Sequence, residues 1–420
     1  MSCTLHRKGR LCLFMHAPPE HTAHMVNSSL LYHGLSLVLA EKPVWLTMNP
    51  RDLRPILNPQ PHLERFGLGG LAHAAAVSVH NCAPLVSDQF SPKLEELRAF
   101  VLGHEPSGVY LHYYLPFWYP VVAICREHNI PVGLHVPVFY HRGGSRRHEV
   151  PMHVEKDPLA IEAARGADFI TVSQDADVAV VASRLRIPPS RVHVLPKGIP
   201  RDAWTDASRR FDRRFATRLE PGLREDQPLL TYIGRFEKIK NISWFLAECM
   251  PLLARWESRF QVLLSGWGSE MSRVRGLASG FPNVAIVEGV LSYSETLRLL
   301  GSCDGVIFPS GYDFAPRLPL EALSLQKPVV LGDFNFNHLY RPYAISVPRA
   351  GEDTAVLEYS NERVVYGRPD AGAMARAIAE LIDSRRGALA GAEEGTSPFL
   401  DRLDGGSAPR VLLDAFESHS

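Results

Sequence analysis

The sequence predicts an α/β protein made of two doubly wound domains, each a mostly parallel sheet with helices on both faces. Apolar strand-like runs alternate with helix-like runs twice, over residues 11–200 and again over 228–333. A charged stretch with few aliphatic residues separates the two series, and 420 residues exceed what one core usually supports. We therefore expect an N-terminal domain over 1–204, a crossing over 205–227, a C-terminal domain over 228–390, and a polar segment with a short helix over 391–420 that packs back on the N-terminal domain.

The individual elements follow from apolar patterning and from helix-start residues. In the first half, buried runs predict strands at 11–19, 43–50, 107–116, 130–141, 168–174 and 191–200. Helices are expected within 20–40 and at 91–103, 117–129, 161–166 and 175–187. In the second half, strands are expected at 228–236, 260–268, 283–290, 305–310 and 327–333, with helices at 241–256, 270–280, 292–303, 318–326, 371–386 and 409–416.

Composition excludes several classes of function. Lys+Arg and Asp+Glu both number 45, so the total charge does not indicate a nucleic-acid binder. The six cysteines are scattered singly without metal-ligand spacing, which is typical of reduced structural thiols in a cytoplasmic protein. The apolar run near the start is too short for a signal-peptide core, and no run is long enough to cross a membrane.

Two carboxylates bracket a helix start between two predicted strands. Asp313 follows the apolar run 305–310, and Glu321 lies inside the next helix, whose first turn contains Pro319. Ligands of open α/β sheets bind at the carboxyl ends of the strands, and a helix N-terminus favours anions. The plainer alternative is that Glu321 only stabilises its helix and that Asp313 is a solvated loop residue.

An ordered series of motifs precedes this stretch. Arg235 follows a strand-end glycine in IGRFEKIKN, with Lys240 five residues later; Gly266, Trp267 and Gly268 end the next strand, and Gly289 precedes another helix start. In this order and spacing, residues 228–385 resemble the family 4-type retaining glycosyltransferases (glycosyl transferases group 1) of the GT-B fold. That fold consists of two Rossmann-like domains that face each other across a cleft.

The resemblance implies roles for individual residues. Arg235 and Lys240 are expected to bind the diphosphate of a nucleotide sugar and to stabilise the charge that develops on the leaving group, without a metal or cofactor. Glu321 is expected to hold the ribose hydroxyls, and Asp313 to approach the donor sugar. The wider donor site is expected to include Gly266, Trp267, Gly268, Gly289, Phe314, Arg317 and Leu318. The alternatives are a solvated basic turn for the cations and a tight turn for the glycines.

The first half is less informative about the site. The resemblance implies a histidine near the donor sugar after the strand at 130–141, for which His135 is the candidate and His141 the local rival. His16, His21 and His24 stand where the family has a glycine-rich loop, which predicts a bulkier, more polar acceptor side. Tyr113 and Tyr114 are candidates for lining the acceptor site.

The sequence also departs from the family pattern. The first acidic residue is Asp313 instead of Glu, Pro316 removes a backbone N–H, and Arg317 adds a cation. The turn that usually reads Pro-Asn-Gly is Pro196-Lys197-Gly198, and residues 333–343 lack the family's Gly-Gly segment.

These features predict a retaining, metal-independent glycosyltransferase that passes a sugar from a nucleoside diphosphate, with UDP and GDP as first choices, to a small acceptor. The altered loops favour a specialised pathway such as antibiotic synthesis, with an unusual donor or a sulfur or amine acceptor. A helper protein that binds nucleotide or a partner without catalysis is one alternative, and a nucleotide-sugar epimerase is another. The nucleotide, the acceptor and the oligomeric state, including a homodimer, stay open.

Overall fold

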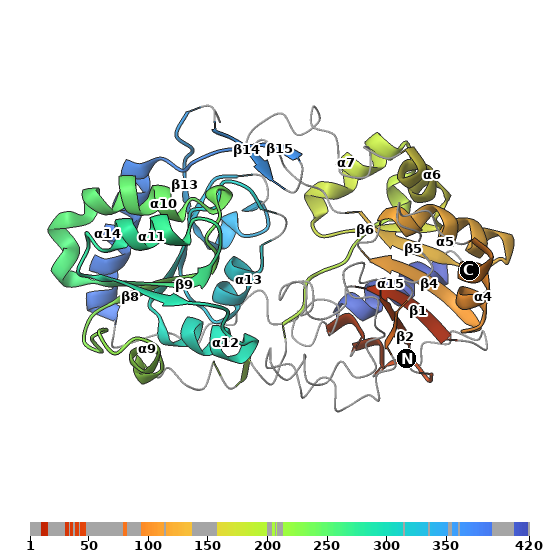
Figure 1. Cartoon of the computed structure of the whole chain (residues 1–420), viewed down its shortest axis with the longest axis horizontal. Coiled ribbons are helices and arrows are strands. Elements are labelled where there is room, and N and C mark those ends of the chain that lie inside the picture. The colour runs from red at the N-terminus through yellow and green to blue at the C-terminus, as the bar shows by residue number, and fades with distance from the viewer. Residues whose placement is uncertain are drawn as a thin grey trace. The chain divides into compact units, whose positions relative to one another are not determined.

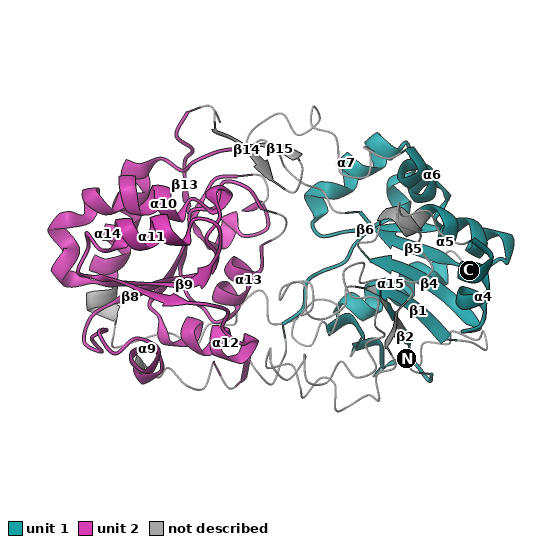
Figure 2. Cartoon of the chain, in the orientation of Figure 1, with its two compact units in different colours: residues 1–138, 151–200, 401–420 teal, residues 139–150, 201–400 magenta. Residues whose placement is uncertain are grey.

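The computed structural model describes most of the two sheets and the helices that cover them. Described are residues 10–15, 30–32, 34–36, 38–41, 43–47, 79–81, 94–112, 115–136, 158–199, 204–205, 207, 213–313, 316–334, 337–351, 355–359, 362–388 and 407–418. Contacts divide the chain into two units (Figure 2). Unit 1 comprises residues 1–138, 151–200 and 401–420, and unit 2 comprises residues 139–150 and 201–400.

Unit 1 is built on a seven-stranded sheet in the order β3-β2-β1-β4-β5-β6-β7, in which neighbouring strands are parallel. Its strands are β1 (Arg10–Met15), β2 (Val44–Thr47), β3 (Val79–Asn81), β4 (Pro106–His112), β5 (Val132–His135), β6 (Phe169–Val172) and β7 (Val192–Val194). Its helices are α4 (Leu94–Leu102), α5 (Leu115–Glu127), α6 (Pro158–Gly166), α7 (Asp175–Leu185) and α15 (Ser407–Ser418). Residues 30–32 and 34–36 are also helical.

Unit 2 repeats this plan with a six-stranded sheet in the order β10-β9-β8-β11-β12-β13, again parallel throughout. The strands are β8 (Leu229–Arg235), β9 (Gln261–Trp267), β10 (Val284–Glu288), β11 (Gly305–Phe308), β12 (Val329–Gly332) and β13 (Ile345–Val347). The helices are α9 (Arg213–Leu219), α11 (Met271–Ala278), α12 (Tyr293–Ser302), α13 (Arg317–Ser324) and α14 (Ala371–Ala388). A two-stranded antiparallel ribbon pairs β14 (Ala355–Tyr359) with β15 (Glu362–Tyr366).

Helices cover both faces of the unit 2 sheet. Helix α11 packs beside the helical segment that follows β8, whereas α12 packs with α9 and α13 on the opposite face (Figure 1). The strands between them are apolar and buried, as the runs VVLG of β12 and GVIF of β11 show. The expected α/β architecture with two Rossmann-like domains is therefore confirmed.

One expected helix is less regular than its sequence pattern indicates. The segment predicted as a continuous helix at 241–256 consists of a short α-helix α10 (Ile242–Trp244), a π-helical turn (Phe245–Cys249) and a 3-10 stretch (Met250–Arg259). Pro251 explains part of this change, because it has no N–H to donate to the preceding turn.

Several boundaries agree with the sequence. Pro319 lies in the first turn of α13, and Ser292 forms a capping box with Glu295 at the start of α12. Helix α15 forms where the C-terminal apolar run predicts one, while the polar segment 389–406 lies outside the described residues. Among the described helices, none combines the length and the apolar character needed to span a bilayer.

Candidate active site

The candidate site in unit 2 lies where the strand order of its sheet reverses. Strands β8 and β11 are neighbours there, although β9 and β10 separate them in sequence. Arg235 is the last residue of β8, and Asp313 lies in the loop that follows β11. Open α/β sheets bind ligands at this kind of switch point, beyond the carboxyl ends of the strands.

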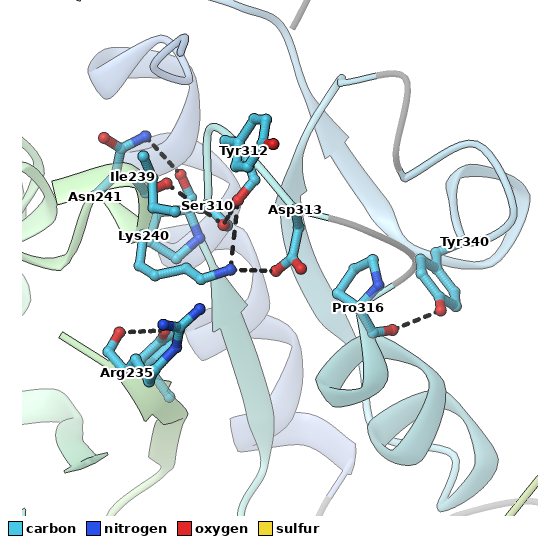
Figure 3. A network of polar contacts seen from close by, with 11 residues as sticks. Arg235, Ile239, Lys240, Asn241, Ser310, Tyr312, Asp313, Pro316 and Tyr340 are labelled. Atoms are coloured by element: carbon cyan, nitrogen blue, oxygen red, sulfur yellow. Dashed lines mark hydrogen bonds and ion pairs between the residues drawn. The ribbon is translucent and has the colours of Figure 1, made fainter. Parts of the chain in front are cut away.

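The reversal brings Lys240 and Asp313 into direct contact (Figure 3). Lys240 Nζ lies 2.5 Å from Asp313 Oδ2 and donates a longer bond of 3.4 Å to the carbonyl oxygen of Tyr312. Burial lowers the pKa of Lys240, while the Asp313 carboxylate raises it and the Arg235 charge lowers it further. The two predicted cations and the predicted carboxylate thus form one cluster, whose Lys–Asp pair retains some exposure, 10% and 20% by side chain.

The loop that carries Asp313 is held by contacts that sequence reasoning missed. Asn241 donates its side-chain amide to the carbonyl oxygens of Pro309 at 3.0 Å and Gly367 at 2.8 Å. The Gly311 N–H donates to the Ile239 carbonyl at 2.9 Å, and Ser310 donates to Tyr312 O (Figure 3). Asn241 adopts φ 57°, a backbone conformation that Asn tolerates better than most residues. The presence of Asn at this position was the signal that the sequence offered.

Glu321 takes part in a second, more deeply buried charge cluster. Arg317 Nε donates to Glu321 Oε1 at 2.8 Å, with both side chains at most 6% exposed. Arg317 also donates to the Tyr293 hydroxyl at 3.0 Å, and its guanidinium lies 5.5 Å from the ring centre of Tyr293. Burial lowers the pKa of Arg317, but Tyr293 and Glu321 together raise it above its ordinary value. Arg317 is therefore a partner of Glu321 inside α13, a role that the sequence did not suggest.

The glycines near the strand ends are required by the backbone of unit 2 itself. A Cβ on Gly266 would lie 1.8 Å from the Gly234 carbonyl oxygen, and one on Gly268 would lie 2.4 Å from that of Phe236. Gly289 has φ 111° and donates its N–H to Gly266 O at 2.9 Å. Trp267 at the end of β9 is 48% exposed. Its predicted contact with a nucleotide base stays a prediction, as do the donor contacts of the glycines.

The remaining predicted donor residues differ in position. Leu318 is buried in α13, and Phe314 lies outside the described residues. The carbonyl oxygen of Pro316 accepts a bond of 2.6 Å from the buried Tyr340 hydroxyl, which ties the start of α13 to the segment after β12 (Figure 3).

In unit 1, His135 ends β5 and lies in a polar network. Its Nδ1 is 3.0 Å from Thr171 Oγ1 and its Nε2 is 3.4 Å from Ser173 Oγ. Burial lowers the pKa of His135 to about 3, and the charge of Lys197 adds to this effect. The ring is therefore neutral at physiological pH, so it can donate to a hydroxyl, but it is not poised to titrate there. The other predicted N-terminal residues, His16, His21, His24, His141, Tyr113 and Tyr114, lie outside the described residues.

The segment that contains the candidate site matches a known family model. Residues 227–384 match the model of glycosyl transferases group 1. This confirms the resemblance inferred for 228–385, and it covers Arg235, Lys240, Asp313 and Glu321 together.

Curated proteins with similar sequences match part of this chain. Alpha-D-kanosaminyltransferase of Streptomyces kanamyceticus is 26% identical over 43% of this chain and 47% of its own length. Alpha-galactosylglucosyldiacylglycerol synthase of Streptococcus pneumoniae is 26% identical over 41% of this chain and 46% of its own length. The chain thus spans about half the length of the curated relatives it matches.

Solved structures extend the similarity to nearly the whole fold. A glycosyltransferase from Rickettsia africae has a TM-score of 0.62 at 11% identity and covers 98% of this chain and 94% of its own. Anabaena Alr3699/HepE, solved with UDP and glucose, has a TM-score of 0.63 at 14% identity and covers 98% and 100%. UDP-GlcNAc 2-epimerase from Neisseria meningitidis has a TM-score of 0.59 at 13% identity and covers 97% and 100%. At these identities the likeness establishes the GT-B-type fold.

Proposed function

We propose that this protein is a retaining, metal-independent glycosyltransferase that moves a sugar from a nucleoside diphosphate to a small acceptor. The observation that carries the proposal is the cluster of Arg235, Lys240 and Asp313 at the switch point of the unit 2 sheet. The family match to the same segment supports it. Anabaena Alr3699/HepE, which shares the fold, was solved with UDP and glucose.

In this proposal Lys240 exchanges partners when the donor binds. Its ammonium lies 2.5 Å from Asp313 Oδ2, so it is already positioned beside the end of β8. A diphosphate that approaches Arg235 offers Lys240 more negative charge than one carboxylate does. Asp313 is then released toward the hydroxyls of the donor sugar.

The two cations stabilise the charge that develops on the leaving diphosphate as the anomeric bond breaks. The leaving phosphate takes the acceptor proton on the same face of the sugar, which gives retention. Since Lys240 and Arg235 neutralise the leaving group, the reaction is proposed to proceed in the presence of a chelator. Glu321, whose Oε1 accepts from Arg317, remains an acceptor for the ribose hydroxyls.

The acceptor belongs to a specialised pathway in this proposal, with an unusual donor or a sulfur- or nitrogen-linked product. The departures at Asp313, Pro316 and 333–343 motivate this part, and a curated relative is a kanosaminyltransferase.

The first test is calorimetric titration with UDP, GDP, ADP and dTDP, followed by turnover of the matching sugar donors. Arg235→Ala and Lys240→Ala are expected to lower turnover by about 100-fold or more while the fold persists. Lys238→Gln is the matched control, because this exposed lysine lies two residues before Lys240. Full turnover in Arg235→Ala would contradict the proposal.

An epimerase is the second candidate, because UDP-GlcNAc 2-epimerases share the fold. Incubation of the donor without any acceptor separates the two reactions. Formation of an epimerised nucleotide sugar without acceptor would identify an epimerase. A donor that stays unchanged without acceptor and is consumed when acceptor is added identifies a transferase.

A further inference from the structure

Tyr293 is a buried residue of unit 2 that connects the start of α12 to the charge pair of α13. It is the first residue of α12, the helix that follows β10. Ser292 Oγ accepts from the Glu295 N–H at 3.2 Å, and Glu295 Oε2 accepts from the Ser292 N–H at 2.8 Å. Helix α12 also packs beside α13 (Figure 1). The backbone of Tyr293 is therefore fixed by the cap of its own helix.

The Tyr293 side chain holds the Arg317 guanidinium through two contacts. Its hydroxyl accepts a hydrogen bond of 3.0 Å from Arg317 Nη2, and its ring centre lies 5.5 Å from the guanidinium carbon. The Nε of the same guanidinium donates to Glu321 Oε1 at 2.8 Å. Because a guanidinium is rigid and planar, Arg317 links the position of the Tyr293 ring to the position of the Glu321 carboxylate.

The phenol of Tyr293 stays neutral in these surroundings. Burial raises the pKa of Tyr293 above its ordinary value, and the Glu321 carboxylate raises it further, while the Arg317 cation opposes this effect. A hydrogen bond with Glu321 also contributes to the raised pKa. A neutral hydroxyl can donate to a carboxylate while it accepts from a guanidinium. Tyr293 thus acts on both members of the ion pair.

The position of Arg317 in its helix indicates that this network does not serve the helix itself. Arg317 is the first residue of α13, where the free N–H groups favour an anion and disfavour a cation. The cation also precedes the carboxylate by four residues, which is the weaker of the two possible orders on a helix. The buried cation is therefore stabilised by Glu321 and Tyr293 and not by α13. A network that local helix rules disfavour is typical of a functional site.

We propose that Tyr293 is a positioning residue of the nucleotide site, which orients the Glu321 carboxylate toward the ribose hydroxyls through Arg317. The inference rests on the proposed function, in which Glu321 accepts from the ribose. A glutamate side chain has several rotamers, and a carboxylate that is already held in one of them loses less freedom when the ribose binds. The Tyr293 hydroxyl is therefore expected to affect recognition of the ribose and not recognition of the diphosphate.

The test compares ribonucleotides with deoxyribonucleotides in the parent and in Tyr293→Phe. Calorimetry measures the affinities for UDP and 2′-deoxy-UDP, and for GDP and 2′-deoxy-GDP. The parent is expected to prefer one ribonucleotide over its deoxy form by roughly tenfold or more, since a hydrogen bond to a charged group is lost with the 2′-hydroxyl. Tyr293→Phe should reduce this preference by about threefold or more and leave the affinity for the deoxy form nearly unchanged.

Two controls separate positioning from packing. Tyr110→Phe removes another buried hydroxyl, which lies 2.6 Å from Thr171 Oγ1 in unit 1, and should leave the ribose preference unchanged. In the double variant Arg317→Met/Glu321→Gln, which lacks the bridge, Tyr293→Phe should change the preference no further. An intact preference in Tyr293→Phe, with the fold verified by circular dichroism, would overturn the proposal. An equal loss of affinity for both nucleotide forms would also overturn it, because the phenol then acts by packing alone.

The outcome is separable from that of the proposed function. A parent protein that binds none of the four nucleotides would reject the transferase, and the role of Tyr293 with it. A parent that binds UDP and 2′-deoxy-UDP, or GDP and 2′-deoxy-GDP, equally well would reject ribose recognition by Glu321 while nucleotide binding stands. A parent that prefers the ribonucleotide, together with a Tyr293→Phe protein that prefers it to the same extent, would reject the positioning role alone.

Discussion

The two ion pairs of the candidate site, Lys240–Asp313 and Arg317–Glu321, differ in burial, and therefore in what they do. The Lys240–Asp313 pair keeps side-chain exposures of 10% and 20%, so an incoming anion can compete for the lysine. The Arg317–Glu321 pair is more deeply buried, with side-chain exposures of 6% and 5%, and Arg317 also donates to the Tyr293 hydroxyl. A pair of this second kind holds its members in place, because removal of one leaves the other charge buried and unpaired.

Arg317→Met is therefore expected to destabilise unit 2 by about 3–5 kcal/mol and to weaken nucleotide binding by roughly tenfold. The physical reason is that Glu321 loses its counter-charge and takes up a proton, so it can no longer fill the proposed role of a charged acceptor for the ribose hydroxyls. Denaturant unfolding and calorimetry with the preferred nucleotide measure the two effects.

The double variant Arg317→Met/Glu321→Gln serves as the control for this prediction. With neither charge left in the interior, it should recover part of the lost stability but none of the nucleotide affinity. A double variant as unstable as the sum of the two single variants would contradict a direct coupling.

Asp177 in the first turn of α7 is the residue whose titration should be visible in stability. It is completely buried, neither carboxylate oxygen has a hydrogen-bond partner among the described residues, and burial raises its pKa to about 8. The folded protein therefore retains this proton between about pH 4 and 8, while the unfolded chain releases it. Stability should fall as pH rises through this window, by up to about 1.4 kcal/mol per pH unit.

Asp177→Asn should remove this dependence of stability on pH. The difference in melting temperature between the variant and the parent should therefore grow in favour of the variant as the pH rises from 5 to 8. Asp175→Asn, at an exposed position in the same turn, should leave the slope unchanged. Identical pH profiles for the parent and Asp177→Asn would show that Asp177 does not titrate in this range.

At the scale of elements, the loop between β11 and α13 is positioned by a close approach of backbone segments. A Cβ on Gly311 would lie 1.8 Å from Gly367 O and 2.8 Å from Asn241 Nδ2. Both atoms belong to the contact that aligns the loop, so the position of Asp313 beside Lys240 depends on the missing side chain.

Gly311→Ala is expected to cost about 1–3 kcal/mol and to lower turnover more than stability alone explains, because Asp313 shifts away from Lys240. Thermal unfolding and transfer assays on the same sample measure this. Gly276→Ala in α11 is the matched control, since a Cβ there meets no atom within 4 Å, and it should stabilise the protein by up to about 1 kcal/mol. Equal effects of the two alanines would refute the packing argument.

At the scale of the whole molecule, the chain returns to unit 1 with its last helix. Residues 401–420 belong to unit 1, and Phe416 of α15 meets Phe169 of β6 edge to face at 4.8 Å. Gly108 of β4 accommodates this ring, because a Cβ there would lie 2.9 Å from Phe416 Cε1. The C-terminal helix is thus part of the core of the N-terminal sheet.

Phe416→Ala should therefore destabilise unit 1 by about 3–5 kcal/mol while nucleotide binding in unit 2 persists. Hydrogen exchange resolved by segment, together with calorimetry, separates the two units. Arg410→Ala, on the exposed face of α15, should change neither measurement. Loss of protection in both units would show that they unfold together.

The sequence was informative where the signal is local. The alternation of buried strands and helices predicted both sheets, and the motif series singled out Lys240 and Asp313, which the fold brings into contact. It failed where partners are distant in sequence. The sequence also did not show that Arg317 pairs with Glu321 in the same helix and with Tyr293, while its expected contact with the donor stays a prediction. Gly311 and Asn241 escaped notice because their partner Gly367 follows after 56 and 126 residues, respectively.

By itself, then, the sequence determined the fold class, the two parallel sheets and the residue types of the candidate site. These depend on hydrophobic period and on short motifs, which are properties of neighbouring residues. Only the tertiary structure decided that Lys240 pairs with Asp313, because the strand order places β8 beside β11. It also decided that α15, at the end of the chain, belongs to unit 1. Burial then sets the protonation of His135 and Asp177, and burial is a property of the folded chain.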